Sequence, residues 1–341
     1  MKVFVTGGTG YIGRILVPMM AKAGYEVTVL DRMFLNYDDV VSEYTAMGVK
    51  VIRDDIRYFE PNLLNGFDSV VDLAALSNDP SGDLDPLKTW DINYLGRVRV
   101  ARLSKKLGVK RYVMASSCSV YGFRDDIADE TSVPNPLTTY AQANIGIERD
   151  NLPLGDDNFT TTALRFATAF GYSKRMRFDL AINAMALNTY NTGVIKLMRD
   201  GEQFRPFVHI VDISRSIMKT LDSDKEIVNR EIFNIGSDSL NLKLKDLANL
   251  VGRTVDSSFK IEWYGDPDAR SYRASFKKAT ERLGFAANVS IEAGVKEIVE
   301  ELKNGELKDI LETHTMEFYK KLIQAQDLIE KYTLVKANRV L

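Results

Sequence analysis

The chain has 341 residues, of which 45% are apolar and 27% are charged. These fractions exclude a disordered or fibrous protein, and the length suits two lobes better than a single core. The formal net charge is -2 and no basic cluster is interleaved with aromatic residues, so we do not expect nucleic-acid binding.

Short apolar runs alternate with helical patterns in the first half of the chain. The helical spacing of Ile12, Leu16 and Met20 predicts a helix over residues 11–23. Strands are predicted at 2–6, 27–30, 49–52, 69–73 and 111–114. Strands that alternate with helices favour a parallel, doubly wound, Rossmann-like sheet.

The second half of the chain has a looser pattern. Residues 171–191 look like the start of a second lobe, whereas 208–221 and 231–235 look like a return to the sheet. Residues 242–341 are expected to be mostly helical, with one strand near 259–263 and an amphipathic helix over about 307–332. We therefore predict a Rossmann domain over 1–170 and about 205–236, and a smaller, mostly helical lobe over 171–204 and 237–341.

Residues that could hold a metal or form a disulfide are scarce. Cys118 is the only cysteine, and the histidines are His209 and His314. No internal disulfide can form, and a metal site or a His-based triad is not expected. No run of about 18 apolar residues occurs. These features favour a cytoplasmic protein that neither spans a membrane nor carries a metal.

A glycine triplet follows the first predicted strand and opens the first helix. Gly7, Gly10 and Gly13 stand at G-x-x-G-x-x-G spacing, where a pyrophosphate can approach backbone N–H groups at a helix N-terminus. Asp31 ends the second strand, near the spacing at which a carboxylate binds the adenosine ribose. It would repel a 2'-phosphate, so NAD is expected rather than NADP, although adjacent Arg32 tempers this preference.

Two residues after the third strand are candidates for adenine contacts. Asp55 could accept a hydrogen bond from the adenine amino group, and Ile56 could pack on the ring. From position alone, a loop acid and a core residue are equally good interpretations.

Eight motifs together resemble the extended short-chain dehydrogenases/reductases that act on nucleotide sugars. They are TGGTGYIG (6–13), DLAAL (72–76), ASSCSVYG (115–122), PLTTYAQAN (136–144), LRFATAFG (164–171), RPFVHIVD (205–212), FNIGS (233–237) and DARSYRAS (268–275). This resemblance covers most of the chain. It implies an NAD-dependent enzyme whose substrate is a UDP, GDP, CDP or dTDP sugar.

The resemblance also assigns site residues. It implies Tyr140 as the acid/base, Ser117 as the assisting hydroxyl, and Asn144 at the third catalytic position. The residues implied at the cofactor are Gly7, Gly10, Tyr11, Ile12, Gly13, Asp31, Arg32, Asp55, Ile56, Leu73, Ala74, Ala75, Asn93, Tyr140, Asn144 and Phe166. Those implied at the substrate are Ser117, Thr168, Arg205 and Arg270, with the two arginines on its diphosphate.

Asn144 departs from the family pattern. Relatives carry a lysine four residues after the tyrosine, where its charge lowers the phenol pKa from about 10 and its amine binds the nicotinamide ribose. No lysine occurs between Lys110 and Lys174. An asparagine can still hydrogen-bond the ribose but carries no charge. The alternative hypothesis is therefore a catalytically impaired NAD-binding sensor or scaffold.

The residues after Ser117 bear on the reaction. Dehydratases and decarboxylases of this type carry acids there, whereas this chain has Cys118 and Ser119. We therefore expect redox chemistry at C4, as 4-epimerisation or 4-dehydrogenation, with Cys118 as a buried small residue. Relatives dimerise through the tyrosine helix and the one before it, so a homodimer built on 84–107 and 140–151 is expected.

Overall fold

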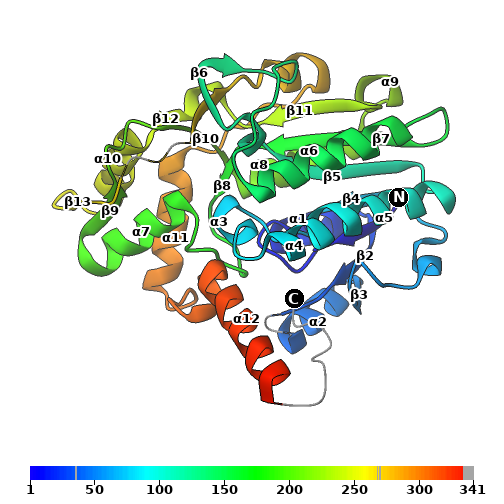
Figure 1. The fold of residues 1–341 in the computed structure, drawn as a ribbon, viewed down its shortest axis with the longest axis horizontal. Coiled ribbons are helices and arrows are strands. Elements are labelled where there is room, and N and C mark those ends of the chain that lie inside the picture. Colours follow the sequence, from blue (N-terminus) through cyan, green and yellow to red (C-terminus); the bar gives the residue numbers. More distant parts are fainter. Residues whose placement is uncertain (35–36, 267, 269, 333–341) are drawn as a thin grey trace.

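A computed structural model describes residues 1–34, 37–266, 268 and 270–332. Across these residues the largest sheet has seven parallel strands, in the order β11-β7-β5-β4-β1-β2-β3 (Figure 1). They are β1 (Lys2–Thr6), β2 (Glu26–Asp31), β3 (Lys50–Arg53), β4 (Ser69–Asp72), β5 (Arg111–Ser117), β7 (Thr160–Phe166) and β11 (Glu231–Ile235). The strand order reverses between β1 and β4, and ligands bind at such a reversal, beyond the carboxyl ends of the strands.

Helices cover both faces of this sheet. Side chains alternate along a strand, so in β1 Val3 and Val5 enter one apolar cluster and Phe4 enters the other. The flanking helices are α1 (Gly13–Lys22), α2 (Tyr37–Ala46), α5 (Arg97–Lys106), α6 (Thr139–Asn151) and α8 (Ile210–Asp222). Helices α1 and α8 contact each other in the first cluster, and α5 and α6 contact each other by the second. This arrangement confirms the Rossmann-like doubly wound fold.

Most of the smaller elements gather beyond the carboxyl edge of the sheet, at the left of Figure 1. Three small sheets pair β8 (Thr168–Phe170), β10 (Phe204–His209) and β12 (Asn241–Lys243); β9 (Val194–Met198) and β13 (Lys260–Tyr264); and β6 (Phe123–Ala128) and β14 (Ser271–Ala274). Helices α7 (Ala181–Thr192), α10 (Leu244–Val255) and α11 (Ile291–Lys303) pack on one another.

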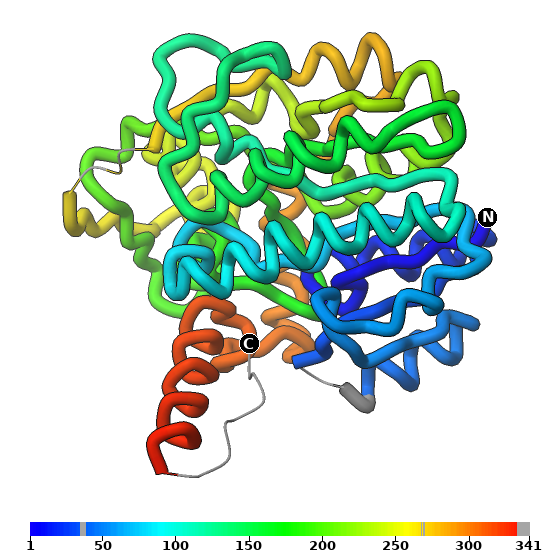
Figure 2. The backbone as a smooth tube through the Cα atoms, turned by 45° about the vertical axis from the view of Figure 1, so that its right-hand side comes forward, coloured from blue at the N-terminus to red at the C-terminus, as the bar shows by residue number. Residues whose placement is uncertain are grey.

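Short helical segments connect these elements. They are η1 (Pro61–Leu64), α3 (Asp79–Gly82), α4 (Pro86–Thr89), η2 (Trp90–Gly96), η3 (Cys118–Tyr121), η4 (Leu152–Leu154), α9 (Lys225–Val228), η5 (Asp238–Leu240), η6 (Ala279–Leu283) and η7 (Leu311–Thr313). The last helix is α12 (Thr315–Tyr332), whose final turns extend away from the body of the protein (Figure 2). In the part of the chain that the structure describes, no helix has both the length and the apolar character needed to span a bilayer.

The structure corrects three predictions for the second half. Residues 208–221 do not form a sheet segment: β10 ends at His209 in a small sheet, and α8 follows. Buried Ile210, Ile213 and Ile217 recur at helical spacing, which explains why this stretch packs as a helix. The single strand expected near 259–263 is β13, but β12 and β14 also occur, and the final helix begins at Thr315 rather than near 307. Residues 333–341 lie outside the described residues, and the proposed domain boundaries stay a prediction.

Candidate active site

One cavity of about 440 Å³ opens at the carboxyl ends of β1, β4 and β5. Sixteen of the predicted site residues besides Ser117 and Tyr140 line it: Gly7, Gly10, Tyr11, Ile12, Gly13, Asp31, Arg32, Asp55, Ile56, Leu73, Ala74, Ala75, Phe166, Thr168, Arg205 and Arg270. Asn93 and Asn144 do not line it. Asn93 is buried and bonds the backbone of Leu76, whose N–H donates to its Oδ1 at 2.8 Å. It shapes the loop after β4.

The glycine turn packs too tightly for side chains. Gly7 has φ of +71°, and a Cβ there would lie 2.7 Å from the backbone nitrogen of Ala74. A Cβ on Gly13 would lie 2.4 Å from the carbonyl of Gly8, at the point where α1 begins. The turn is therefore set by backbone contacts between β1, α1 and the loop after β4.

Two acidic residues, Asp31 at the end of β2 and Asp55 just after β3, also line the cavity. Asp31 accepts hydrogen bonds from the backbone N–H groups of Thr9 at 3.0 Å and Met33 at 2.8 Å, which fix its carboxylate at the end of β2. Asp55 pairs with Arg57 at 2.7 Å and with Arg32 at 2.8 Å. Burial opposes the charge of Asp55, but hydrogen bonds from Arg57 and Arg32 outweigh it and hold its pKa below the usual value. Asp55 is thus ionised and partly neutralises Arg32.

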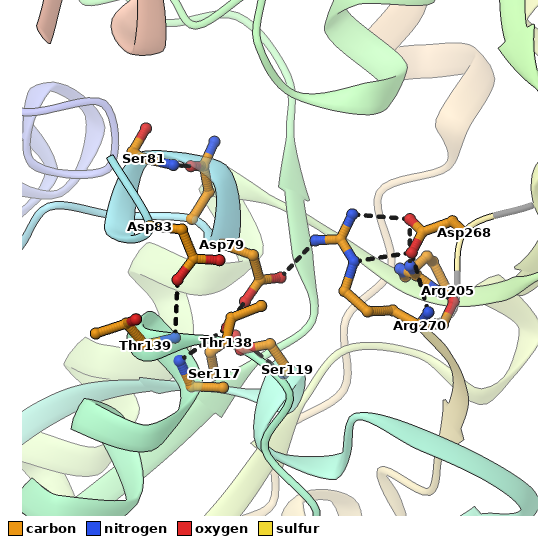
Figure 3. Close-up of polar contacts among 12 residues, drawn as sticks. Asp79, Ser81, Asp83, Ser117, Ser119, Thr138, Thr139, Arg205, Asp268 and Arg270 are labelled. Atoms are coloured by element: carbon orange, nitrogen blue, oxygen red, sulfur yellow. Dashed lines mark hydrogen bonds and ion pairs between the residues drawn. The ribbon is translucent and has the colours of Figure 1, made fainter. Parts of the chain in front are cut away.

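Tyr140 lies in the first turn of α6. The side chain of Thr138 caps this helix and also donates to Asp79 at 2.6 Å (Figure 3). Helix α3 packs closely here, because a Cβ on Gly82 would lie 2.7 Å from the Cβ of Tyr140. Ser117, at the end of β5, accepts from the N–H of Ser119 at 3.1 Å. The start of α6 is therefore held against α3 and the end of β5.

The environment of Tyr140 acts on its pKa in both directions. Burial raises the pKa above the usual value, and Asp79 adds to that effect. The polar side chains of Asn144 and Ser117, together with the charge of Arg97, lower it. The net direction is upward, so the phenol alone favours the protonated form at neutral pH.

Arg97 is a residue of this site that the sequence did not reveal. It lines the cavity, is 1% exposed, and forms a buried ion pair with Asp72 at 2.8 Å. Its Nη1 lies 3.4 Å from Oδ1 of Asn144. The pattern gives no signal for this contact, because Arg97 precedes Asn144 by 47 residues.

Two arginines and two acids form a cluster in the lining of the same cavity. Asp268 pairs with Arg205 at 3.0 Å and with Arg270 at 2.7 Å. Arg270 also pairs with Asp79 at 3.0 Å, so Asp79 lies between Thr138 and Arg270 (Figure 3). The two guanidinium groups that were predicted at the substrate are therefore brought together from separate segments.

The first turns of α12 also reach the cavity, which the sequence did not predict. Thr315, Phe318 and Tyr319 are among its lining residues. Arg175 donates to Oγ1 of Thr315 at 3.0 Å, and Phe34 and Tyr319 make an edge contact. The signal in the sequence for this side of the cavity was limited to residues 171–191, the expected start of the second lobe, which contain Arg175.

Cys118 and His209 have structural surroundings. Cys118 is fully buried, as expected, and its thiol donates to the carbonyl oxygen of Arg165 at 3.3 Å. Burial raises the pKa of this thiol, which keeps it protonated and unreactive. His209 caps α8 and lies 2.9 Å from Glu297.

With this geometry in view, the similarity to known proteins identifies the family. The model of the NAD dependent epimerase/dehydratase family matches residues 3–236. The chain belongs to this family. Among curated relatives, UDP-glucuronate 4-epimerase of Thermodesulfobacterium geofontis is 25% identical over 86% of this chain and 94% of its own length. UDP-glucose 4-epimerase of Bacillus subtilis has the same identity and coverage.

Solved structures agree with the family assignment. MoeE5 in complex with UDP-glucuronic acid and NAD is 27% identical, with a TM-score of 0.79 over 89% of this chain and all of that one. A further curated relative, UDP-glucuronic acid decarboxylase 1 of Arabidopsis thaliana, is 25% identical over 89% of this chain and 70% of its own length. The chain is therefore an NAD-dependent enzyme of the nucleotide-sugar epimerase/dehydratase type.

The residues of the cavity fit NAD. The glycine turn leaves no room for side chains between β1 and α1, and Asp31 retains lone pairs for ribose hydroxyls beyond its two backbone contacts. Asn144 is 2% exposed, and its Nδ2 is a buried donor with no partner among the described residues. This donor belongs to a residue outside the cavity lining and remains available for a further hydrogen bond.

Proposed function

We propose that this protein catalyses oxidoreduction at C4 of a nucleotide-linked sugar, as a 4-epimerase or a 4-dehydrogenase. One observation carries the proposal: Tyr140 and Ser117 line the same cavity as the glycine turn and the Arg205–Arg270 pair. These are the groups that a cofactor pyrophosphate, a reacting hydroxyl and a substrate diphosphate would each need.

Tyr140 is the proposed acid/base. In its phenolate form it takes the proton of the C4 hydroxyl, while the C4–H bond breaks and a carbonyl forms. NAD, when bound, accepts the hydride that leaves C4. Ser117 donates a hydrogen bond to the same sugar oxygen and holds it in place. In epimerisation, hydride is then delivered to the opposite face of the C4 carbonyl, and Tyr140 returns the proton to the C4 oxygen.

The arginine cluster favours a diphosphate. Arg205 and Arg270 present planar, permanently charged groups that suit phosphate oxygens. They are held by Asp268 and Asp79, so a diphosphate would compete with carboxylates that already orient both side chains. Thr168 lines the cavity at the start of β8 and could hydrogen-bond the same phosphates.

Elimination and decarboxylation rank below C4 redox chemistry. The residues after Ser117 are buried Cys118 and Ser119, which offer no carboxylate. Asp79 and Asp268 are each engaged by Arg270 (Figure 3), and Asp179, which also lines the cavity, is engaged by Arg177. Among the described residues, these carboxylates are therefore occupied by ion pairs rather than available as the acid/base partner that loss of water or carbon dioxide needs.

A second candidate is an NAD-binding sensor or scaffold with little turnover. The uncharged Asn144 beside Tyr140 is the observation that favours it. We also propose a homodimer through α5 and α6, which light scattering of the purified protein would test.

The test begins with the purified protein. Bound nucleotide is released and identified, and the protein is then incubated with NAD and a panel of UDP-, dTDP-, GDP- and CDP-sugars from neutral to alkaline pH. NADH absorbance and NMR spectra of the products report the reaction. We expect one class of sugar to be converted, and no conversion by the Tyr140→Phe variant. Bound NAD with every sugar unchanged would contradict the proposal and favour the sensor or scaffold.

A further inference from the structure

A phenol that acts as a base in a buried site needs a positive charge nearby, and α6 does not provide one. The residue one turn after Tyr140 on the same helix face is Asn144, and the next is Glu148. Glu148 is already held by Arg165 at 2.6 Å. A cation for Tyr140 must therefore come from another element.

Arg97, the first residue of α5, is the buried cation that reaches this face. Its Nε bonds Asp72 at 2.8 Å, and its Nη2 donates to the carbonyl oxygen of Ala115 at 2.6 Å. Asp72 is itself held by hydroxyl groups of Thr6 and Tyr112, each at 2.6 Å. Burying a guanidinium group is unfavourable unless its donors are satisfied, so this network fixes the side chain in one orientation. That orientation aims Nη1 at α6.

The contact between Arg97 and Asn144 decides how the amide is turned. A guanidinium group only donates hydrogen bonds, so the amide must present its oxygen to Nη1, which lies 3.4 Å from Oδ1. The Nδ2 group then points away from Arg97. It is the buried donor without a partner among the described residues.

We propose that Arg97 and Asn144 divide one task between them: Arg97 supplies the positive charge that stabilises the Tyr140 phenolate, and Asn144, whose oxygen faces Arg97, supplies a neutral donor beside the phenol. Arg97 is a positioning residue in this scheme, because it acts through Asn144 and through its field. The proposal rests on the function proposed above, with Tyr140 as the base.

The charges around Tyr140 are consistent with this division. Burial raises the pKa of Tyr140, Asn144 lowers it, Asp79 raises it and Arg97 lowers it. Asp79 faces Tyr140 from α3 but is paired with Arg270 at 3.0 Å, which offsets part of its charge. Behind Arg97 stand Asp72 and Tyr112, on the side away from α6. Arg97 is the positive group whose removal should change the titration most.

The experiment compares Arg97→Gln, the charge-conserving Arg97→Lys, and Arg102→Gln as a matched control. Arg102 lies on the same helix but is exposed. Turnover is followed against pH. The phenol is titrated by its absorbance in each protein, as the difference from the same protein with Tyr140→Phe. The second readout needs no turnover.

The sign of the effect follows from the active form of the tyrosine. The phenolate is the base, so loss of a stabilising cation raises its pKa and moves the rise in turnover to higher pH. We expect Arg97→Gln to raise the phenol pKa by about one unit and to lower kcat about tenfold at neutral pH, with KM little changed. Arg97→Lys should restore most of both, and Arg102→Gln should match the parent. A phenol that titrates in Arg97→Gln as it does in the parent would overturn the proposal.

A paired variant guards against misfolding, since Arg97→Gln leaves Asp72 buried without its counterion. Arg97→Gln with Asp72→Asn removes both charges and keeps hydrogen-bonding groups, which folded proteins tolerate better than a broken pair. We expect a rise in phenol pKa in the same direction but smaller, because the negative charge of Asp72 is removed as well. An unshifted phenol in this folded variant would again overturn the proposal. If the phenol shifts but no sugar is ever converted, the proposed function fails and the charge assignment stands. If sugar is converted but the phenol pKa does not shift, the proposed function stands and the charge assignment to Arg97 fails.

Discussion

The two ends of the cavity are built in different ways. At the cofactor end, Gly7, Gly10 and Gly13 lie within one turn of chain, and Asp31 closes the next strand. At the tyrosine end, the groups that act on Tyr140 come from α3, β5, α5 and, through Arg270, from the chain after β13. The cofactor end depends on the shape of the backbone, whereas the tyrosine end depends on charged side chains from segments that are distant in the sequence. A local motif can therefore be intact at one end while the chemistry is rearranged at the other.

The largest expected effect separates the two ends. Tyr140→Phe removes the proposed base and should lower kcat about 10²- to 10⁴-fold, because general acid–base catalysis contributes on that scale. NAD binding should persist, since the glycine turn and Asp31 are untouched. Single-turnover kinetics and calorimetric titration with NAD measure the two properties. An equal loss of kcat and of NAD affinity would mean that the cofactor end and the tyrosine end of the cavity are not independent.

The backbone packing at the cofactor end is tested by Gly13→Ala. The new methyl group would lie 2.4 Å from the Gly8 carbonyl, so the backbone must shift, at a cost of about 1–3 kcal/mol in stability. Gly10→Ala is the matched comparison, because its Cβ would lie 3.2 Å from the nearest backbone atom. Denaturant unfolding without ligand should show a smaller loss for Gly10→Ala. A larger loss of stability for Gly10→Ala than for Gly13→Ala would contradict the packing argument.

Substrate affinity at the tyrosine end is tested by Arg270→Gln. Loss of one of two guanidinium groups should raise KM for the nucleotide sugar about tenfold, since a charge-assisted hydrogen bond contributes about 1.5–3 kcal/mol. Arg273→Gln serves as the control, because Arg273 is not among the cavity-lining residues. An unchanged KM in Arg270→Gln would place the diphosphate elsewhere.

The smallest expected effect is on cofactor choice. Asp31→Asn keeps a hydrogen-bond acceptor and the shape of the side chain, but it removes the negative charge that would repel a 2'-phosphate. The ratio of NAD to NADP affinity should fall several-fold. Arg32 would attract a 2'-phosphate, but its ion pair with Asp55 at 2.8 Å weakens that attraction and limits the change. Competition binding of the two cofactors measures this ratio. A ratio equal to that of the parent would show that Asp31 does not set the preference.

Much of the fold could be predicted because its signals are local. The strands at 2–6, 27–30, 49–52, 69–73 and 111–114 are each found within a few residues of the expected bounds. The prediction at 208–221 was wrong because a short apolar stretch can be interpreted as a strand or a helix, and the helical spacing of its buried isoleucines was not given enough weight. The helix expected over 84–107 is divided into α4, η2 and α5, which places Arg97 at the start of a new helix.

Taken alone, the sequence predicted the glycine turn and the acid at the end of β2 from their spacing along the chain. The resemblance to the family implied the roles of Tyr140 and Ser117 and showed that Asn144 stands where relatives carry a lysine. Only the tertiary structure brought Arg97 to Asn144, joined Arg205 and Arg270 through Asp268, and placed α12 beside the cavity. The reason is physical: electrostatic interactions act through space, and the position of a buried charge is fixed by packing between elements rather than by its distance along the chain.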